Sequence, residues 1–539
     1  MDPSQKKVSI LKRKLLQMRI AFFQYLLTHF KVLWYIFLNT PGLKKYSRRF
    51  LYNLVGSGAV YPFPYTTKHP YVTVDGIEDY SYYARMLPEK PRAADYKYPP
   101  VDELVKDIFL RRHKSDSSQH TDRNSSLLFG GFAQWFAAGF LLTDPTHHGR
   151  SGLYPTSTAN VNTVYGNDEK TRRVLRSMSG GKLKSQKING QEYPMYIKDL
   201  PEIKESPLMS AFLQRTATHA AINNTDRGVI DSETLFAFGQ IQINSTPGAM
   251  VWGIVFLREH NQICDELQKI YPDWDDERLY QTARNICTLI LNKIVVVDYI
   301  GRHNGHHLAM DIPFSPEVLT GPQWSFGSVT RVPIEWNHLY RFHSFVPDTM
   351  KFNSKEMPIA SVLYRPDFVV QHGLDAVVDQ LSRYPICPFG PQNTPFFLLP
   401  AEKNTIEAGR QANLATYNDY RERMGLLRAL SFEEINPDPS VVEALHKHYK
   451  SVDDVEFYVG LIAEKVQKDR LFPMLLQRML SCVAFKIILL QPWLAPSVWK
   501  RRDEMLMPFG SKRLDETSIQ SLFYRHVANE TYVSFFLPR

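Results

Sequence analysis

The segment IEWNHLYRFHSFVPD, from Ile334 to Asp348, places a tyrosine three residues before a histidine. On a helix, positions i and i+3 share a face, so we expect Tyr340 and His343 to point the same way. Bulky apolar residues on either side would bury that face. A buried phenol beside an imidazole is either a satisfied polar pair in a helical core or an axial histidine that binds a metal, with an oxidisable tyrosine next to it. The pair alone leaves both interpretations open.

The elements that must position this pair are predicted to be helices. Residues 248–298 have a strong helical pattern, and the apolar run 127–144 has the length of a buried helix. Alternating strand patterns and internal repeats are scarce. Further helical segments separated by proline-rich turns are expected at residues 367–383, 403–425 and 440–495. We therefore predict a mainly α fold in which residues 59–539 form one large domain.

The cysteine content excludes two classes of structure. The chain has four scattered cysteines and no CxxC pair, at Cys264, Cys287, Cys387 and Cys482. This spacing argues against a disulfide scaffold and against a thiolate metal site.

The basic charge is concentrated at the N-terminus. Residues 1–50 hold eleven Lys or Arg and one acid, Asp2, so the rest of the chain is nearly neutral although the net charge is +9. These cations are interleaved with aromatic and aliphatic residues, which is typical of amphipathic helices in a lipid interface and not of a nucleic-acid-binding arm. We predict that residues 1–58 bind one membrane leaflet. A single membrane span is the alternative, although His29 and Lys31 interrupt its middle. No signal peptide is recognisable, because no small-residue cleavage site follows the apolar stretch.

Several segments, in order along the chain, resemble the prostaglandin H synthases (cyclooxygenases) of the animal haem-peroxidase superfamily. EWNHLYRFH is similar to the segment with that family's radical tyrosine and proximal haem histidine, and FAQWFAAGF to its distal haem helix. FLREHNQICDEL, NVNTVYG, KINGQEYP and ASVLYRPDFVVQHG also have counterparts. The resemblance covers almost the whole chain, although the family's cysteine-rich N-terminal module is not recognisable.

The resemblance implies an animal haem-peroxidase-like helical fold with one haem b per chain. It implies a dioxygenase in which a tyrosyl radical abstracts a bis-allylic hydrogen from a polyunsaturated fatty acid before O₂ adds. The substrate would arrive from the membrane side, and the endoplasmic reticulum or another endomembrane is the expected location. A homodimer is compatible with the family, and no nucleic-acid partner is expected.

On the proximal side, the resemblance assigns His343 as the haem ligand and Tyr340 as the radical tyrosine. Tyr299 matches a second tyrosine that orients the first, and Asn337 also fits the family pattern. A core tyrosine that only satisfies its hydroxyl is the alternative for both phenols. His338 lies on another face of the predicted helix and is a poor rival as a ligand.

The distal side departs from the family. Its glutamine is present as Gln134, with Trp135 beside it, but Ala138 stands where the family has its distal histidine. Because losing a positioned acid or base costs about 10²–10⁴-fold in rate, we predict haem binding with weak peroxidase turnover. His147 and His148 lie in a loop-like stretch and are not expected to compensate.

The substrate entrance also departs from the family. Ser57 replaces the arginine that pairs with a fatty-acid carboxylate, and His306 replaces its tyrosine partner. An Arg–carboxylate pair adds both energy and orientation. Without it, we expect an acid bound in reverse, an acid held by His306, or an ester or amide substrate. Ala484 matches the serine that aspirin acetylates in family members, so no covalent chemistry is expected there.

Two other functions stay open at this stage. One is a catalytically silent haem-binding homologue that keeps the scaffold for binding or partner interaction. The other is a haem isomerase that acts on hydroperoxides, for which general acid–base cleavage is not required.

Overall fold

The computed structural model describes residues 65–68, 82–112, 125–140, 159–205, 230–300, 314 and 332–538, except residues 468, 469, 490 and 529, together with isolated positions between 15 and 46. Most of the predicted membrane-binding segment, residues 1–58, lies outside the described residues. Among those described, no helix combines the length and the apolar character needed to cross a membrane.

The described part of the chain is mainly helical, which confirms the predicted fold class. The longer helices are α6 (Leu127–Ala138), α10 (Pro247–Ile270), α11 (Asp276–Ile294), α14 (Leu374–Arg383), α15 (Leu399–Gln411), α18 (Pro439–His448), α20 (Met474–Leu489) and α22 (Arg502–Glu516). The shorter ones are α5 (Val101–Leu104), α7 (Asn162–Tyr165), α8 (Glu169–Leu175), α12 (Trp336–Leu339), α13 (Pro366–His372), α16 (Tyr417–Arg423), α17 (Phe432–Ile435), α19 (Phe457–Ala463), α21 (Pro496–Trp499) and α23 (Ile519–Tyr524).

Strands in the described residues form three small antiparallel pairs. They are β1 (Tyr65–Thr66) with β2 (Ala84–Arg85), β3 (Ser185–Ile188) with β4 (Gln191–Pro194), and β5 (Thr349–Phe352) with β6 (Lys355–Pro358). Asn189 and Gly190, which connect β3 to β4, both have positive φ, at 51° and 78°. An Asn-Gly turn of this kind matches the twist of a two-residue hairpin.

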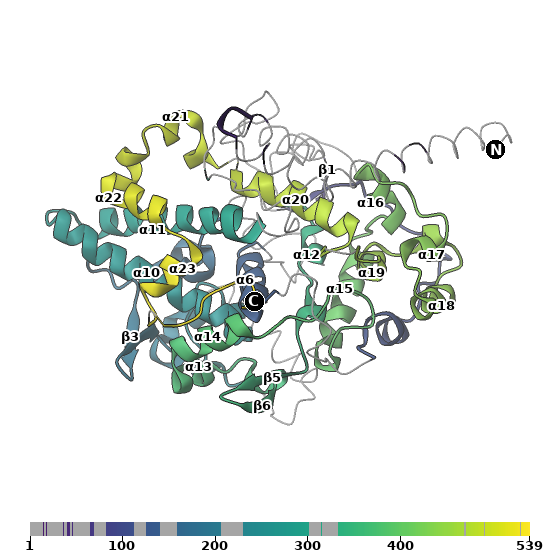
Figure 1. Ribbon diagram of the computed structural model, residues 1–539, viewed down its shortest axis with the longest axis horizontal. Coiled ribbons are helices and arrows are strands. Elements are labelled where there is room, and N and C mark those ends of the chain that lie inside the picture. Colours follow the sequence, from purple (N-terminus) through teal and green to yellow (C-terminus); the bar gives the residue numbers. More distant parts are fainter. Residues whose placement is uncertain are drawn as a thin grey trace.

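Helix α6 lies in the middle of the molecule, with α10 and α11 on one side and α12, α15 and α19 on the other (Figure 1). Its close crossing with α10 depends on glycine. A Cβ atom placed on Gly131 would lie 2.6 Å from the Cα atom of Gly248, which a real side chain does not tolerate. The two backbones therefore touch, and the aromatic side chains of α6 pack around this contact.

The segment with Tyr340 and His343 is not one helix, so the predicted shared helical face is wrong. Helix α12 ends at Leu339, and Tyr340 follows with φ −95° and ψ 36°. His343 begins a separate 3₁₀ turn that ends at Phe345. The pair is therefore held by tertiary contacts and not by helical spacing.

Two features keep this segment from continuing as a helix. The buried Arg111 guanidinium donates to the carbonyl oxygens of Ser344, at 3.2 Å, and Val346, at 2.8 Å. Those carbonyls are therefore not free to accept bonds from a following helical turn. Pro347 also disfavours helical geometry at the residue before it, and Val346 is extended, with ψ 118°.

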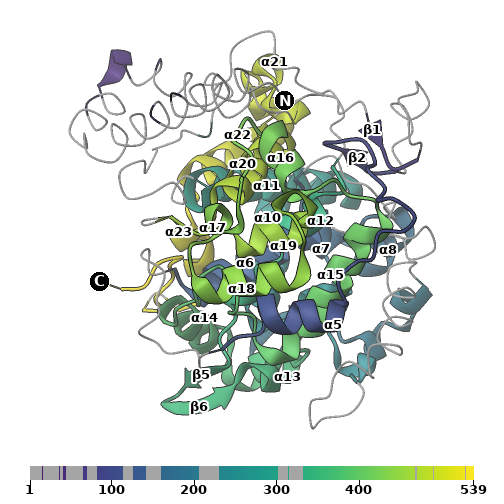
Figure 2. The ribbon, with the colours of Figure 1, turned by 90° about the vertical axis from the view of Figure 1, so that its right-hand side faces the viewer.

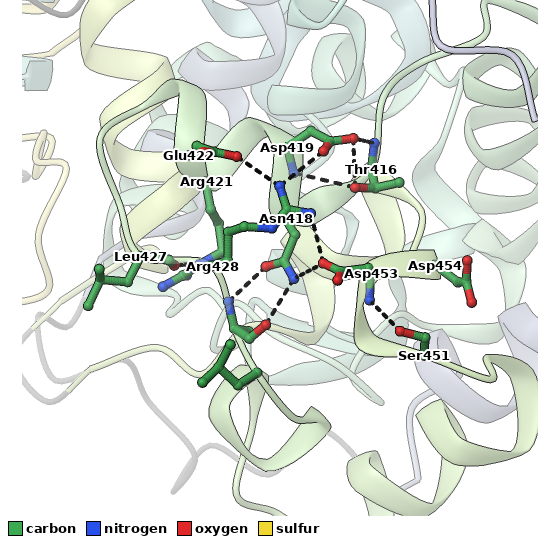
Figure 3. A network of polar contacts seen from close by, with 12 residues as sticks. Thr416, Asn418, Asp419, Arg421, Glu422, Leu427, Arg428, Ser451, Asp453 and Asp454 are labelled. Carbon is green, nitrogen blue, oxygen red and sulfur yellow. Dashed lines mark hydrogen bonds and ion pairs between the residues drawn. The ribbon is translucent and has the colours of Figure 1, made fainter. Parts of the chain in front are cut away.

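A polar network joins α16 to the 3₁₀ turn Val452–Asp454, which precedes α19 (Figure 3). Arg428 donates to the carboxylates of Asp419, Glu422 and Asp453, at 3.1, 2.9 and 2.7 Å. Asn418 joins the same network by donating to Asp453. Figure 2 shows α16 and α19 on the same side of the molecule as α15, so these two helices back the helix that supplies a carboxylate to the site.

Candidate active site

Tyr340 and Tyr299 meet although they come from separate segments. Tyr299 lies in a π-helical turn, Val295–Ile300, that continues α11, and turns of this kind are common at functional sites. The two hydroxyls share a hydrogen bond. Burial raises the pKa of both phenols well above the ordinary value for tyrosine. Both side chains are therefore protonated at neutral pH.

An aromatic cluster connects this tyrosine pair to α6. The ring of Phe136, on α6, lies 6.2 Å from the Tyr340 ring and 6.4 Å from the Tyr299 ring, centre to centre. Phe129, about two turns before Phe136 on the same face of α6, stacks on Tyr299 at 5.0 Å and contacts Phe345 at 6.3 Å. The predicted distal helix and the His343 segment thus belong to one packed unit.

His343 presents one ring nitrogen to a buried carboxylate. Its side chain is 18% exposed, and Nδ1 lies 3.1 Å from Oε1 of Glu402, a residue of α15 that is 1% exposed. In the present ring orientation the N–H direction misses that oxygen, so the hydrogen bond is not fully formed. Nε2 forms no hydrogen bond with any described residue. Nε2 is therefore the ring nitrogen that would bind an iron atom.

Glu402 is a site residue that sequence reasoning missed. Its Oε1 accepts from the Thr394 hydroxyl at 2.8 Å, and its Oε2 accepts from the Tyr458 hydroxyl. The segment LPAEKNT is an ordinary helix start, in which a glutamate is expected to face solvent. The packing of α15 against α19 and other segments buries this side chain, and no local sequence pattern predicts that packing.

His338, the rival ligand, is not placed to bind a large cofactor. It is buried in α12, and burial lowers its pKa to about 3, so its ring is neutral at physiological pH. Its ring packs against Phe457 and Tyr458, at 6.1 and 5.9 Å. The cavity beside it, which Gly409 also lines, measures only about 20 Å³. That space holds a water molecule and not a porphyrin.

Gln134 and Ala138 lie four residues apart on an accessible face of α6, whereas Trp135 is fully buried. The Gln134 amide donates to the Ser245 hydroxyl at 2.6 Å and accepts from the Thr246 hydroxyl at 2.7 Å. Its side chain is therefore held in place at the start of α10. Because Ala138 has no titratable group, this face of α6 offers an amide but no acid or base.

The remaining predicted residues are located as follows. Asn337 is buried in α12, and its backbone carbonyl oxygen accepts from the Arg341 side chain at 2.7 Å. Ala484 is buried in α20. Outside the described residues lie Ser57, His306, His147 and His148.

These residues fit a haem. An accessible imidazole whose second nitrogen faces a buried carboxylate is a typical arrangement for a metal-binding histidine. On α6, Gln134 and Ala138 are accessible, and the buried Phe129 and Phe136 of the same helix connect it to Phe345 and Tyr340 of the His343 segment. The donor set is thus suited to an axial ligand on a flat cofactor.

Comparison with known proteins decides the family. The model of the animal haem peroxidase family matches residues 154–485. The chain belongs to this family. Its members bind haem, so the predicted cofactor class and the predicted resemblance are confirmed.

The relatives with curated descriptions include prostaglandin synthases. Prostaglandin G/H synthase 1 of Rattus norvegicus is 28% identical over 531 residues, which cover 96% of this chain and 83% of that protein. Prostaglandin G/H synthase 2 of Equus caballus is 29% identical over 522 residues, which cover 95% and 81%. These relatives support an oxidoreductase.

Solved structures share the fold. Fatty acid alpha-dioxygenase of Oryza sativa superposes with a TM-score of 0.67 at 15% identity, over 96% of this chain and 98% of that one. Peroxidase A of Dictyostelium discoideum superposes with a TM-score of 0.63 at 17% identity, over 85% and 95%. The helical architecture is therefore that of haem peroxidases and dioxygenases.

Proposed function

We propose that this chain is a haem-dependent fatty-acid dioxygenase in which Tyr340 abstracts the hydrogen atom. The observation that carries the proposal is the hydrogen-bonded Tyr340–Tyr299 pair, packed against α6 beside the segment of His343. Two kinds of relative support the substrate class. They are the prostaglandin G/H synthases and the fatty acid alpha-dioxygenase of Oryza sativa, which has been solved with palmitic acid.

One haem b per chain would be held by His343 through Nε2, with Asn337 and Gln134 near it in the family pattern. The bound haem would supply one-electron oxidising power. Tyr340 is suited to pass that oxidation to a substrate, because a neutral buried phenol can lose an electron and a proton together. The hydrogen bond with Tyr299 holds the Tyr340 oxygen in one orientation and leaves the ring flanked by Phe136 and other apolar side chains.

In the proposed reaction, Tyr340 first accepts a hydrogen atom and later returns it. Its phenoxyl oxygen takes a hydrogen atom from a bis-allylic carbon of a polyunsaturated fatty acid, which leaves a carbon radical. O₂ adds to that carbon and gives a peroxyl radical. Tyr340 returns the hydrogen atom to the peroxyl oxygen, so the net change is addition of O₂ to a C–H bond and the phenoxyl radical is regenerated. A single initiation can thus serve several turnovers.

Initiation is the weak step of this scheme. Ala138 offers no group that moves a proton between two peroxide oxygens, and losing such a group costs about 10²–10⁴-fold. We therefore propose that the chain has weak peroxidase activity and depends on a hydroperoxide, or another oxidant, from outside. The product is a hydroperoxide or an endoperoxide.

Membrane association is part of the proposal. Residues 1–58 would lie in one leaflet of an endomembrane. The fatty acid would enter from this membrane, near Ser57 and His306. A homodimer is compatible with this arrangement. The full-length protein should float with anionic lipid vesicles, and deletion of residues 1–58 should abolish flotation. A full-length chain that stays unbound would contradict this part.

The function is tested by O₂ uptake of the haem-loaded protein in detergent. Polyunsaturated C18–C20 acids with a trace of hydroperoxide should give uptake, and ¹⁸O₂ should label the product. Palmitic acid, which has no bis-allylic hydrogen, should give none. A haem-loaded protein with no uptake from any acid would contradict the proposal and indicate a silent haem protein.

A hydroperoxide isomerase is the second candidate, and Ala138 is the observation that favours it. Such an enzyme rearranges a fatty-acid hydroperoxide without a distal acid or base. Its signature in the same assay would be loss of the added hydroperoxide with no consumption of O₂.

A further inference from the structure

Glu402 is an unusual buried carboxylate in this molecule. It is 1% exposed, and within the part of the chain that the structure describes, the one basic side chain within 4 Å is His343. Its other partners are the hydroxyls of Thr394 and Tyr458. Burying a carboxylate away from water is costly unless its partners compensate.

Other buried glutamates are satisfied in different ways. Glu259 pairs with two arginines, Arg513 and Arg525, which anchor it as part of a structural ion cluster. Glu335 accepts from the Tyr420 hydroxyl at 2.7 Å and from the backbone N–H of Met86 at 3.0 Å. Glu259 also lies 2.7 Å from Nε2 of His526, but it shares its charge with the two arginines, whereas Glu402 has no arginine or lysine partner among the described residues.

We infer that Glu402 is the positioning residue for the proximal histidine, a role that rests on the proposed haem ligation by His343. A metal-binding histidine usually donates its second ring N–H to a carboxylate or carbonyl, which fixes the tautomer and raises the basicity of the ligating nitrogen. Nδ1 of His343 is 3.1 Å from Oε1 of Glu402. A small rotation of the ring aligns its N–H with that oxygen and leaves Nε2 for the iron.

Tyr458 and Thr394 limit the strength of this interaction. Each donates to a different oxygen of Glu402, so the carboxylate is held against rotation and part of its negative charge is engaged. Removing the Tyr458 hydroxyl would free that charge for the His343 N–H. The two hydroxyls therefore adjust how much electron density the histidine gives to the iron, which is a recognised determinant of haem reduction potential.

Two variants should shift the midpoint potential of the haem iron in opposite directions. Glu402→Gln removes the negative charge, so the Fe(III)/Fe(II) midpoint potential should become more positive and the Fe–N(His) stretch should fall in frequency. Tyr458→Phe makes the carboxylate a stronger acceptor, so the potential should become more negative and the frequency should rise. Glu402→Asp keeps the charge and should lie between wild type and Glu402→Gln.

The matched control is Glu335→Gln, which also neutralises a buried glutamate that accepts from a tyrosine. This control should leave potential and stretching frequency unchanged. The measurements are spectroelectrochemical titration and resonance Raman spectroscopy of the haem-loaded proteins, with thermal unfolding recorded alongside.

Several outcomes would overturn the inference. Haem-loaded Glu402→Gln with the wild-type potential and frequency would do so, as would shifts of the same sign in Glu402→Gln and Tyr458→Phe. Haem lost from both Glu402→Gln and Glu402→Asp, with lowered thermal stability, would indicate a structural residue. Haem lost from Glu402→Gln but kept by Glu402→Asp would support the inference. A wild-type chain that binds no haem overturns this inference and the proposed function together, whereas absent O₂ uptake with the predicted shifts overturns only the function.

Discussion

At the scale of single residues, the assignment of His343 as the haem ligand makes the sharpest prediction. One of its nitrogens faces Glu402 and the other is available, whereas His338, in the same segment, is buried beside a cavity too small for haem. His343→Ala should therefore lose haem, measured as loss of the Soret band after reconstitution. His338→Asn, the matched control, should keep it. An unchanged Soret band in His343→Ala would contradict the assignment.

Ala138 allows a gain-of-function prediction. It lies four residues from Gln134 on the accessible face of α6, so Ala138→His should place an acid–base group there. Peroxidase turnover should rise by about 10²–10⁴-fold if the new imidazole serves as a proton shuttle. The assay is oxidation of a reducing cosubstrate by hydroperoxide. Ala138→Leu, which adds bulk without a base, should show no rise, and equal rates in both variants would contradict the prediction.

Single residues also show what the sequence can predict. Tyr340 and Tyr299 were expected to interact from their resemblance to a known family, and the structure joins them by a hydrogen bond. Glu402 was not expected, because its role depends on the burial of α15 against α19, and burial of one helix position cannot be inferred from its own neighbours. The residue identities around Gln134 were recognisable, but its bonds with Ser245 and Thr246 were not.

At the scale of elements, long periodic segments were predictable and short irregular ones were not. The expected helical region 248–298 forms α10, α11 and the π-helical turn with Tyr299. The segment around Tyr340 was expected to be a helix because its apolar residues suit one. Arg111 and Pro347 instead favour an irregular segment, and Arg111 lies more than two hundred positions away in the sequence.

The crossing of α6 and α10 gives a stability prediction. A Cβ atom on residue 131 would lie 2.6 Å from the Gly248 backbone, so Gly131→Ala should destabilise the fold by about 1–3 kcal/mol. Gly130→Ala is the matched control, since its Cβ would meet only Ile386 Cγ2, at 3.6 Å. That change should be neutral or stabilise by up to about 1 kcal/mol through helix propensity. Chemical denaturation measures both, and equal stabilities would contradict the prediction.

At the scale of the whole molecule, buried histidines should make stability depend on pH. His260 accepts from the Tyr165 hydroxyl and donates to the Gly181 carbonyl, both at 2.9 Å, which suits the neutral ring. Burial lowers its pKa to about 4, whereas an unfolded histidine titrates near about 6.5. The unfolded chain therefore holds more protons between these values, and the free energy of unfolding should fall as pH falls through this window.

The contribution of His260 to this pH dependence can be measured from the slope of unfolding free energy against pH. One proton corresponds to about 1.4 kcal/mol per pH unit, so His260→Gln should reduce the slope of unfolding free energy against pH by about that amount between pH 4.5 and 6. Denaturant titrations at several pH values would measure it. An unchanged slope would show that this ring is not the buried neutral group described above.

The fold class of the whole molecule followed from the scarcity of strand patterns and the length of the periodic segments, and the family comparison confirms it. The arrangement of those helices around α6 did not follow, because it depends on the backbone contact between two glycines that are far apart in sequence. The division at residue 58 and the membrane-binding role of the segment before it stay predictions.

The central claim is that Tyr340 abstracts hydrogen from a fatty acid, and one comparison tests it most directly. O₂ uptake with a polyunsaturated fatty acid and a trace of hydroperoxide should be measured for haem-loaded wild type and Tyr340→Phe at equal Soret absorbance. Wild type should consume O₂, and Tyr340→Phe should fall to the rate of the haem-free protein. Equal uptake by both proteins would contradict the account.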